Sequence, residues 1–168
     1  GAATRFGSDK TRYEVGGVAL LDRVLRAVAD AYDLLVVGER RATAVPVTWL
    51  REDPPGSGPA NAVVAALPRV RAPRVVLLAG DLPFVDASTV RRLLAAGGDG
   101  GVLTDADGRR QYLCSAVRTD ALVSAAGGTD WAGHSMRALL APLDLRPCGA
   151  RGREAHDVDT PEDVPSDP

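Results

Sequence analysis

The sequence predicts an α/β domain of three layers, in which helices cover both faces of a mainly parallel sheet. Short, fully apolar runs alternate with helical segments along much of the chain. Strands that are buried on both faces are apolar throughout, and a strand, loop, helix, strand rhythm is typical of crossover units. A chain of 168 residues is long enough for one full hydrophobic core, and no internal repeat or linker divides it. We therefore expect a single domain over residues 1–168.

The composition excludes several classes of partner. Hydrophobic residues make up 45% of the chain, and the formal net charge is −2. This balance is typical of a soluble globular protein and provides no basic footprint for nucleic acid or an anionic membrane. The apolar runs are too short to span a bilayer, and no secretory segment is visible, so we expect a cytoplasmic location. Cys114 and Cys148 have no metal or redox spacing, and we predict that both are buried thiols.

The first half of the chain carries alternating helix and strand patterns. Apolar residues recur at helical spacing from Val18 to Tyr32, with charged residues on the opposite face. The short apolar run Leu34–Val37 predicts a buried strand, and Val45–Leu50 predicts a second extended segment. A loop rich in proline and glycine follows over residues 51–58. Pro59 fits the first turn of a helix that runs to about Leu67.

The middle of the chain predicts a further crossover unit and then a change of character. Arg74–Ala79 is the most apolar strand pattern, and Ser88 is predicted to cap a helix that runs through Ala96. The extended segments Val102–Thr104 and Tyr112–Val117 flank an acidic turn with a glycine. This arrangement predicts a hairpin or a broader antiparallel excursion from the parallel sheet.

The last third of the chain predicts shorter elements. Helical patterns occupy Asp120–Ala126 and Ser135–Leu140. Near the end, Thr160 fits an N-cap, Pro161 a first helical position and Asp163 an acid in the first turn. A strand-to-helix junction is therefore expected just before Pro161.

Lys10 is the only lysine among the 20 cationic side chains, and it stands in a glycine-containing loop that opens the sequence at Gly1. Small residues let backbone N–H groups approach an anion, and an ammonium is a compact charge that suits a phosphate. The alternative is a solvated turn with an ordinary surface lysine. Phosphate-binding loops normally leave the end of a strand, so we expect that a first strand, missing from this sequence, precedes Gly1.

Aspartates follow predicted strands at two positions. Asp81 comes directly after the apolar strand pattern, and Asp159 lies in the junction before Pro161, with Asp157 two residues earlier. The carboxyl ends of parallel strands border the ligand crevice, where carboxylates can hold a divalent cation. Together with Lys10 they predict a site for a Mg²⁺-nucleotide. The alternative for each aspartate is a helix cap or a turn.

Two other kinds of active site fit the sequence poorly. A Walker-type phosphate loop requires its lysine directly after the second glycine, followed by Ser or Thr, and Lys10 lacks both features. A Ser-His-Asp hydrolase requires a nucleophile elbow, and neither histidine stands near such a pattern. We predict that His134 and His156 are surface or loop residues.

Five motifs follow one another along nearly the whole chain. In chain order they are G-x-x-x-R-F-G-x-D-K, V-G-G-x-x-L-L-D-R-V-L, E-D-x-x-G-S-G-P, L-A-G-D-L-P-F-V and D-V-D-T-P-E-D. Together they resemble the motifs of the molybdenum cofactor guanylyltransferases, a family of MobA-like nucleotidyltransferases. The Asp9-Lys10 pair and the D-L-P tripeptide favour this branch over the sugar-phosphate and isoprenoid nucleotidyltransferases. The resemblance implies a Rossmann-like nucleotidyltransferase fold.

The resemblance also implies roles for individual residues. One set would hold the GTP phosphates, a second would contact guanine and ribose, and a third would bind Mg²⁺. Arg5, Lys10 and Asp81 would then form the catalytic group. The residues for the GTP phosphates are Gly1, Arg5 and Lys10. Those for guanine and ribose are Asp53 and the loop at Gly58, and those for Mg²⁺ are Asp81 and, as second ligand, Asp159.

Gln111 lies in the segment 108–113, which matches the stretch that faces the pterin substrate in this family. It is the only glutamine of the chain, and Asn61 is the only asparagine. Tyr112 stands where the family usually has proline. The family's motif G-P-L-A-G reads Gly58-Pro59-Ala60-Asn61-Ala62 in this chain, so a glycine near the base is lost. Both amides are candidates for function, with turn or cap roles as the alternatives.

By this resemblance the chain would transfer GMP from GTP to the terminal phosphate of molybdopterin or the molybdenum cofactor and release pyrophosphate. Transient contact with molybdoenzymes or other proteins of the cofactor pathway is a further expectation. The nearest alternatives are the same chemistry with CTP, or with phospholactate as the acceptor. An alternative of another class is a catalytically silent nucleotide-binding module. The presence of Lys10 together with Asp81 argues against the silent module.

Overall fold

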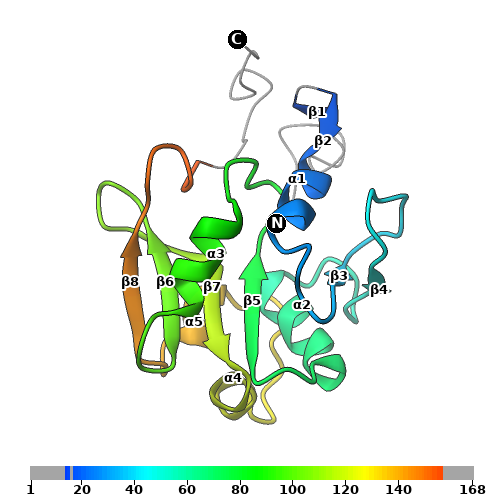
Figure 1. Ribbon diagram of the computed structural model, residues 1–168. Helices are drawn as coiled ribbons and strands as arrows, with labels where there is room; N and C mark the ends of the chain where they lie inside the picture. The colour runs from blue at the N-terminus through cyan, green and yellow to red at the C-terminus, as the bar shows by residue number, and fades with distance from the viewer. Residues whose placement is uncertain (1–13, 16, 157–168) are drawn as a thin grey trace.

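The computed structural model describes residues 14–15 and 17–156, and its centre is a four-stranded sheet in the order β5-β7-β6-β8 (Figure 1). Strands β5, β6 and β8 run in the same direction, and β7 runs antiparallel to both of its neighbours. The predicted antiparallel excursion is confirmed as β6 and β7. The bounds of the strands are Arg74–Leu78 for β5, Gly100–Thr104 for β6, Arg110–Arg118 for β7 and Leu145–Gly149 for β8.

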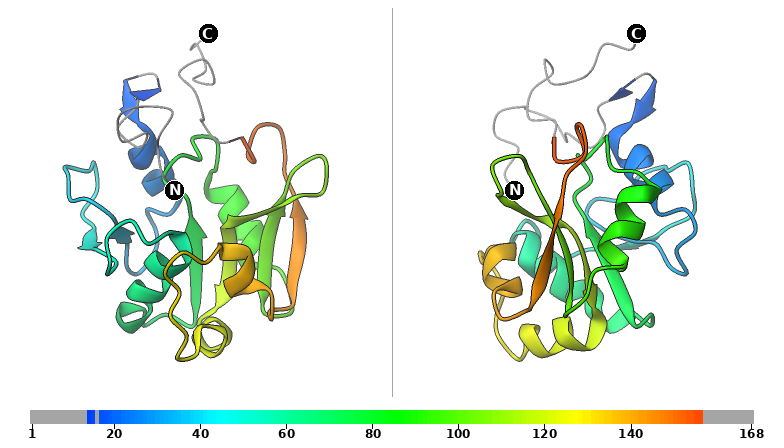
Figure 2. Two further views of the ribbon diagram at one scale, coloured as in Figure 1. Left: turned by 180° about the vertical axis from the view of Figure 1, so that it is seen from behind. Right: turned by 60° about the vertical axis from the view of Figure 1, so that its left-hand side comes forward.

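Helices cover both faces of this sheet, which confirms the predicted three layers (Figures 1 and 2). One core cluster joins the sheet to α1 (Leu20–Ala27) and α3 (Ala87–Leu94). The other joins the opposite face to α2 (Pro59–Ala66), α4 (Thr119–Ala126) and α5 (Met136–Leu140). Successive strand residues serve opposite layers, since side chains alternate across a strand: Val102 belongs to the second cluster and Leu103 to the first.

Helix α3 lies very close to β6, and Gly101 makes this approach possible. A Cβ atom at Gly101 would lie 2.7 Å from the carbonyl oxygen of Leu93 in α3. Any side chain at Gly101 would therefore push the helix away from the sheet. The loop that carries Asp81 leads into α3. The close contact between α3 and β6 therefore helps to hold the end of that loop near the sheet.

The remaining short strands pair among themselves. β1 (Glu14–Val15) and β2 (Val18–Ala19) are antiparallel, whereas β3 (Leu35–Val37) and β4 (Thr48–Leu50) form a parallel pair, and β3 is half-buried rather than fully buried as predicted. A short 3₁₀ helix, η2 (Leu67–Arg69), extends α2. Among the described residues, no helix is long and apolar enough to cross a bilayer.

Several details differ from the sequence predictions. The helix predicted to reach Tyr32 ends at Ala27, where the amides of Val28 and Ala29 bond three residues back, at 3.2 and 3.4 Å, and the chain turns. The cap of α3 is Asp86 rather than Ser88, because the Asp86 carboxylate accepts hydrogen bonds from the amides of Ser88 and Thr89. Strands β1, β2 and β8 were not predicted, and β2 takes the first two residues of the predicted helix, so α1 begins at Leu20 rather than Val18.

The two cysteines also differ from each other. Cys114 is fully buried in β7, as predicted, and burial raises the pKa of its thiol to about 12. Cys148 of β8 is only half-buried, because β8 pairs with β6 on one side and has no partner strand on the other among the described residues. The prediction of a buried thiol was wrong for Cys148.

Candidate active site

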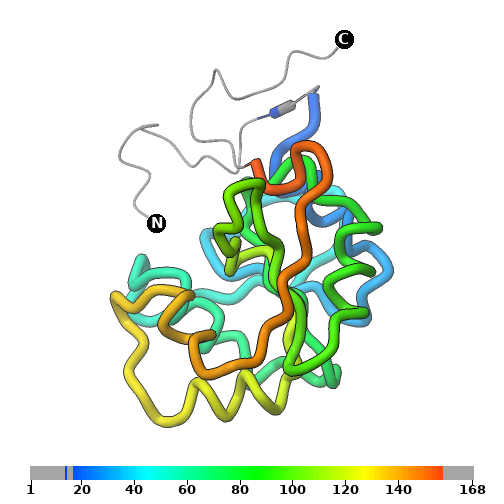
Figure 3. Tube along the Cα trace, turned by 90° about the vertical axis from the view of Figure 1, so that its left-hand side faces the viewer, coloured from blue at the N-terminus to red at the C-terminus, as the bar shows by residue number. Residues whose placement is uncertain are grey.

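Three connections meet at the end of the sheet where β5, β6 and β8 finish (Figures 1 and 3). They are the loop Gly80–Val85 after β5, the turn Asp105–Arg109 after β6 and the segment Ala150–His156 after β8. Ligands of open α/β sheets bind outside the carboxyl ends of the strands. The sheet therefore brings the candidate metal ligand Asp81 and the candidate acceptor residue Gln111 to the same end.

Asp81 is half-buried in the turn that directly follows β5. A carboxylate at this place suits Mg²⁺, which prefers hard oxygen ligands. Among the described residues, no group of three or more His, Cys, Asp or Glu side chains is gathered in a way that could hold a metal ion. Of the two metal ligands that the resemblance implies, Asp81 is the one that the structure describes. Asp157 and Asp159 lie outside the described residues, as do Gly1, Arg5 and Lys10.

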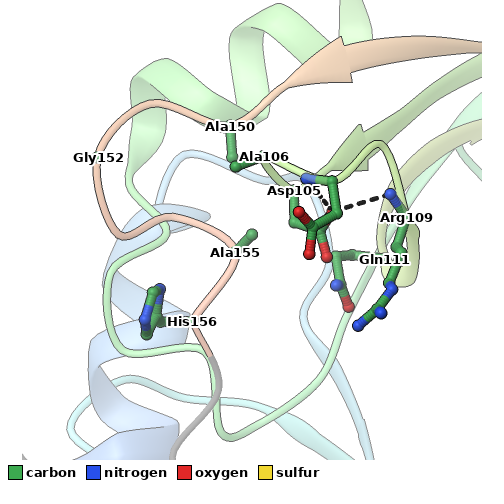
Figure 4. A pocket seen from close by; sticks show the side chains of 9 residues that line it. Asp105, Ala106, Arg109, Gln111, Ala150, Gly152, Ala155 and His156 are labelled. Atoms are coloured by element: carbon green, nitrogen blue, oxygen red, sulfur yellow. Dashed lines mark hydrogen bonds between the residues drawn. The ribbon is translucent and has the colours of Figure 1, made fainter.

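A hollow of about 450 Å³ lies between the β6–β7 turn and the segment after β8 (Figure 4). The Gln111 and Arg109 side chains line one side, together with the acidic turn residues. Ala155 and His156 line the other side. His156 is exposed, as predicted, and also takes part in this wall. The hollow carries both cationic and amide groups, which a ligand with a phosphate and a polar ring edge could use.

Asp105 shapes the turn beside the hollow. Its Oδ1 accepts hydrogen bonds from the amides of Asp107, at 3.0 Å, and Arg109, at 2.8 Å (Figure 4). Gly108 has a φ of 77°, a conformation that L side chains rarely adopt. The carboxylate of Asp105 therefore holds the turn, and the Gln111 amide faces the hollow on this side.

A large bulge in β7 decides which residue stands at the hollow. Val102 pairs with Ser115, but the next residue, Leu103, pairs with Gln111. The residues between them in β7 remain attached to β5, where the Ala79 amide donates to the Leu113 carbonyl at 2.8 Å. Bulges re-aim side chains and are frequent beside active sites. Sequence reasoning missed this bulge; the buried Ser115 within an apolar strand was its visible signal.

The predicted base-binding loop is held by Asn61. The Asn61 Nδ2 group donates to the Asp53 carbonyl at 3.0 Å and to the Ser57 hydroxyl at 2.7 Å. Glu52 closes the same loop by accepting from the Gly56 amide at 2.9 Å. Asn61 therefore serves the loop as a structural tie, which is the turn-type alternative stated for it. Asp53 stays exposed.

Gly58 and Ser57 connect this loop to the rest of the domain. Gly58 has a φ of 103° and directly precedes α2, so a residue with a Cβ would be strained there. The Gly133 amide donates to the Ser57 carbonyl at 2.7 Å. His134 follows in the same turn and is exposed, as predicted, with its ring edge-on to Trp131. Asp53 and Gly58 thus belong to one braced loop at the start of α2.

A family comparison decides how these parts are classified. The model of the MobA-like NTP transferase domain matches residues 1–147. The chain belongs to this family.

Curated relatives of this MobA-like chain match part of it. The bifunctional protein GlmU of Neisseria meningitidis is 35% identical over 117 residues, which are 62% of this chain and 25% of GlmU. A probable molybdenum cofactor guanylyltransferase of Natronomonas pharaonis is 32% identical over 103 residues, or 55% of this chain and 51% of the relative. The chain thus spans between a quarter and about half of the length of these relatives.

Solved structures agree in fold. The molybdopterin-guanine dinucleotide biosynthesis protein A of Archaeoglobus fulgidus superimposes with a TM-score of 0.70 at 19% identity, covering 98% of this chain and 91% of that one. A 2-C-methyl-D-erythritol 4-phosphate cytidylyltransferase of Thermus thermophilus gives 0.66 at 19% identity, covering 92% and 89%. The MobA-like chain therefore has the Rossmann-like nucleotidyltransferase fold that the motifs imply.

Proposed function

We propose that this MobA-like domain transfers GMP from GTP to the terminal phosphate of molybdopterin and releases pyrophosphate. The observation that carries the proposal is the position of Gln111. It comes from the segment that matches the family's pterin-facing stretch, and it lines a hollow at the same end of the sheet as Asp81. The probable molybdenum cofactor guanylyltransferases among the curated relatives support the same assignment.

In the proposed reaction an oxygen of the acceptor phosphate attacks the α-phosphorus of GTP. A bond forms between them, and the bond from the α-phosphorus to the oxygen that bridges to the β-phosphate breaks, so pyrophosphate leaves with its electron pair. The acceptor phosphate is already ionised at neutral pH, so the protein needs no general base. Its work is to position the two substrates and to offset their negative charge.

Each loop has a part in that work. The loop of Asp53 and Gly58 would hold guanine and ribose, and Gln111 would meet the pterin with its amide. Arg5 and Lys10 would neutralise charge on the α-phosphate and the leaving pyrophosphate. Asp81 would hold Mg²⁺ together with Asp159. When bound, this ion supplies further positive charge beside the phosphate oxygens.

The experiment that tests the proposal is pyrophosphate release from ATP, GTP, CTP and UTP, each with and without molybdopterin. We expect release with GTP only when molybdopterin is present, and a product with the mass of the guanine dinucleotide. Release with CTP in place of GTP would assign another base. Absence of release with every nucleotide, while GTP still binds, would favour the silent module.

Variants of Lys10 test the phosphate-binding part of the proposal in the same assay. Lys10→Ala should lower turnover about 100-fold or more with the fold intact, because a charge that acts on the reacting phosphates is lost. Lys10→Arg should restore little, since a planar guanidinium differs in geometry from an ammonium. Turnover of Lys10→Ala near that of the wild type would contradict the phosphate-loop assignment.

A further inference from the structure

Glu154 is a buried acid, only 7% exposed, in the segment that forms one wall of the hollow. Its two carboxylate oxygens are both occupied. Oε1 accepts from the Thr89 hydroxyl at 2.7 Å, and Oε2 accepts from the Arg151 amide at 2.7 Å and pairs with the Arg92 guanidinium. Thr89 and Arg92 belong to α3. Glu154 therefore fastens the wall Ala150–His156 to a helix that precedes it by more than 50 residues.

Further contacts join the wall Ala150–His156 to α3 and to the loop Gly80–Val85. Arg92 also donates to the Gly149 carbonyl at 2.9 Å, so the same guanidinium holds the point where β8 ends and the wall begins. The Arg153 guanidinium lies over the Phe84 ring, 4.1 Å from its centroid. Phe84 stands three residues after Asp81. The wall of the hollow thus touches the loop Gly80–Val85 as well as α3.

Thr89 links Glu154 to the far end of that loop. The Thr89 hydroxyl lies 3.1 Å from Asp86 Oδ1, and the Thr89 amide donates to the same oxygen at 2.9 Å. A hydroxyl has one proton, and its shorter contact is to Glu154. Thr89 itself is fully buried, so its geometry is fixed by packing. Asp86, which directly follows the loop of Asp81, therefore contacts Thr89, and Glu154 contacts the same threonine.

The charge of Glu154 is stabilised in place. Burial would raise the pKa of this carboxyl, but the hydrogen bonds from Arg92, Thr89 and the Arg151 amide outweigh burial, so the pKa lies below its usual value. A buried carboxylate without such donors would be costly. Glu154 is thus a charged side chain that joins the wall to α3, and we call this set of contacts the strut.

We propose that Glu154 is a positioning residue that locks the acceptor wall Ala150–His156 to α3 and to the loop of Asp81. The part that concerns the acceptor rests on the proposed function; the part that concerns the two segments rests on the contacts alone. The strut would hold the acceptor hollow at a fixed distance from the place where the phosphates react. Displacement by about 1 Å is enough to slow a reaction that depends on alignment.

Two variants test the strut, each with a matched control. Glu154→Gln keeps the size of the side chain but removes the negative charge that pairs with the Arg92 guanidinium, and an amide has one acceptor oxygen where the carboxylate has two. Thr89→Val removes only the hydroxyl, and Thr89→Ser retains it. Asp120→Asn is the control for loss of a carboxylate, because Asp120 pairs with Arg118 at the exposed start of α4, away from the hollow.

The first measurement is amide hydrogen exchange on the full chain, which requires no activity. In Glu154→Gln and Thr89→Val, segments 150–156 and 80–86 should both exchange about 10-fold faster, since one contact restrains both. Thr89→Ser and Asp120→Asn should exchange like the wild type. Faster exchange in segment 150–156 alone, or in neither segment, would overturn the proposed lock.

The second measurement is kinetic and applies to the acceptor. The KM for molybdopterin should rise about 10-fold in Glu154→Gln and Thr89→Val, while the KM for GTP stays within about 2-fold, and Thr89→Ser should restore the wild-type value. If kcat and both KM values of the folded variants stay at the wild-type level, Glu154 stabilises the fold and does not position the acceptor. If the wild type transfers no nucleotide, the proposed function fails, and hydrogen exchange still decides whether the lock exists.

Discussion

The buried Ser115 hydroxyl donates a hydrogen bond of 2.9 Å to the Tyr112 carbonyl, across the bulge of β7. The bulge leaves Tyr112, Leu113 and Cys114 outside the ladder with β6 and brings Gln111 opposite Leu103. A carbonyl released from a ladder needs another donor, and Ser115 supplies it. This one hydroxyl therefore helps to determine which side chain of β7 reaches the hollow.

Ser115→Ala should weaken the bulge. We expect a loss of about 1–2 kcal/mol in the free energy of unfolding, since the Tyr112 carbonyl loses its side-chain donor. The KM for molybdopterin should rise at the same time, because Gln111 is no longer held in place. Urea denaturation and steady-state kinetics measure the two effects. Ser124→Ala, at an exposed position of α4, is the control and should change neither quantity. An unchanged KM would separate the bulge from acceptor binding.

Gln111→Ala should raise the KM for molybdopterin about 10-fold and leave GTP affinity nearly unchanged. The expected cost is about 1–2 kcal/mol, as for an unpaired polar contact. Gln111→Glu keeps the size and an acceptor oxygen but removes the donor, so it should not restore binding. Titrations of GTP and of molybdopterin separate the outcomes. Weakened GTP binding would move Gln111 to the nucleotide side, and no change in either would leave it a structural role.

Asn61→Asp should weaken nucleotide binding. The variant removes the Nδ2 donor that joins the Asp53 carbonyl and the Ser57 hydroxyl, and it sets a carboxylate beside both oxygens. We expect the KM for GTP to rise about 10-fold, with the KM for molybdopterin unchanged. Ser57→Ala keeps the contact to Asp53 and should show a smaller effect. Equal increases in both KM values would argue against an assignment of this loop to the base.

Asp81→Asn should lower activity steeply, on the order of 100-fold, and added Mg²⁺ should recover only part of it. The amide keeps the volume of the side chain but removes the negative charge that favours a divalent cation. Asp159→Asn should be milder, and the exposed Asp30→Asn should have no effect. A magnesium titration of turnover measures all three. Small and equal effects of Asp81→Asn and Asp159→Asn would refute the metal site.

Asp86 should make the free energy of unfolding depend on pH in the acid range. The Thr89 amide, followed by Ser88, donates to its carboxylate and lowers the pKa from 3.8 to about 2. The group is charged in the folded state at a pH where it is protonated in the unfolded chain. Its stabilisation is therefore complete above about pH 4 and is lost as the pH falls through about 2.

Asp86→Ala tests this dependence. The variant should lose about 1 kcal/mol in the free energy of unfolding at pH 7, as expected for an N-cap, and the difference from the wild type should shrink below pH 4. Chemical denaturation at a series of pH values measures it. Ser88→Ala should cost less, because Asp86 and not Ser88 is the N-cap. A larger loss in Ser88→Ala would restore the cap that the sequence predicted.

Local patterns were sufficient to predict most elements of this fold. The apolar run Arg74–Ala79 became β5, and Pro59 begins α2, because burial on two faces and a first-turn proline leave a mark within a few residues. The motif order also predicted the family. Strand β8 was not predicted from the sequence, because Leu145–Gly149 contains an arginine and a proline and so lacks an apolar strand pattern. An edge strand tolerates both residues.

The sequence by itself therefore determined the layers, the family and the candidate residues, since periodicity and motifs are properties of neighbouring residues. The tertiary structure decided what those residues contact. Gln111 stands at the hollow because β7 bulges between two partners, and Glu154 is charged and buried because Thr89 and Arg92 meet it. Thr89 lies 65 positions away in the chain. Such contacts arise only when the sheet and helices have packed, so no local pattern can reveal them.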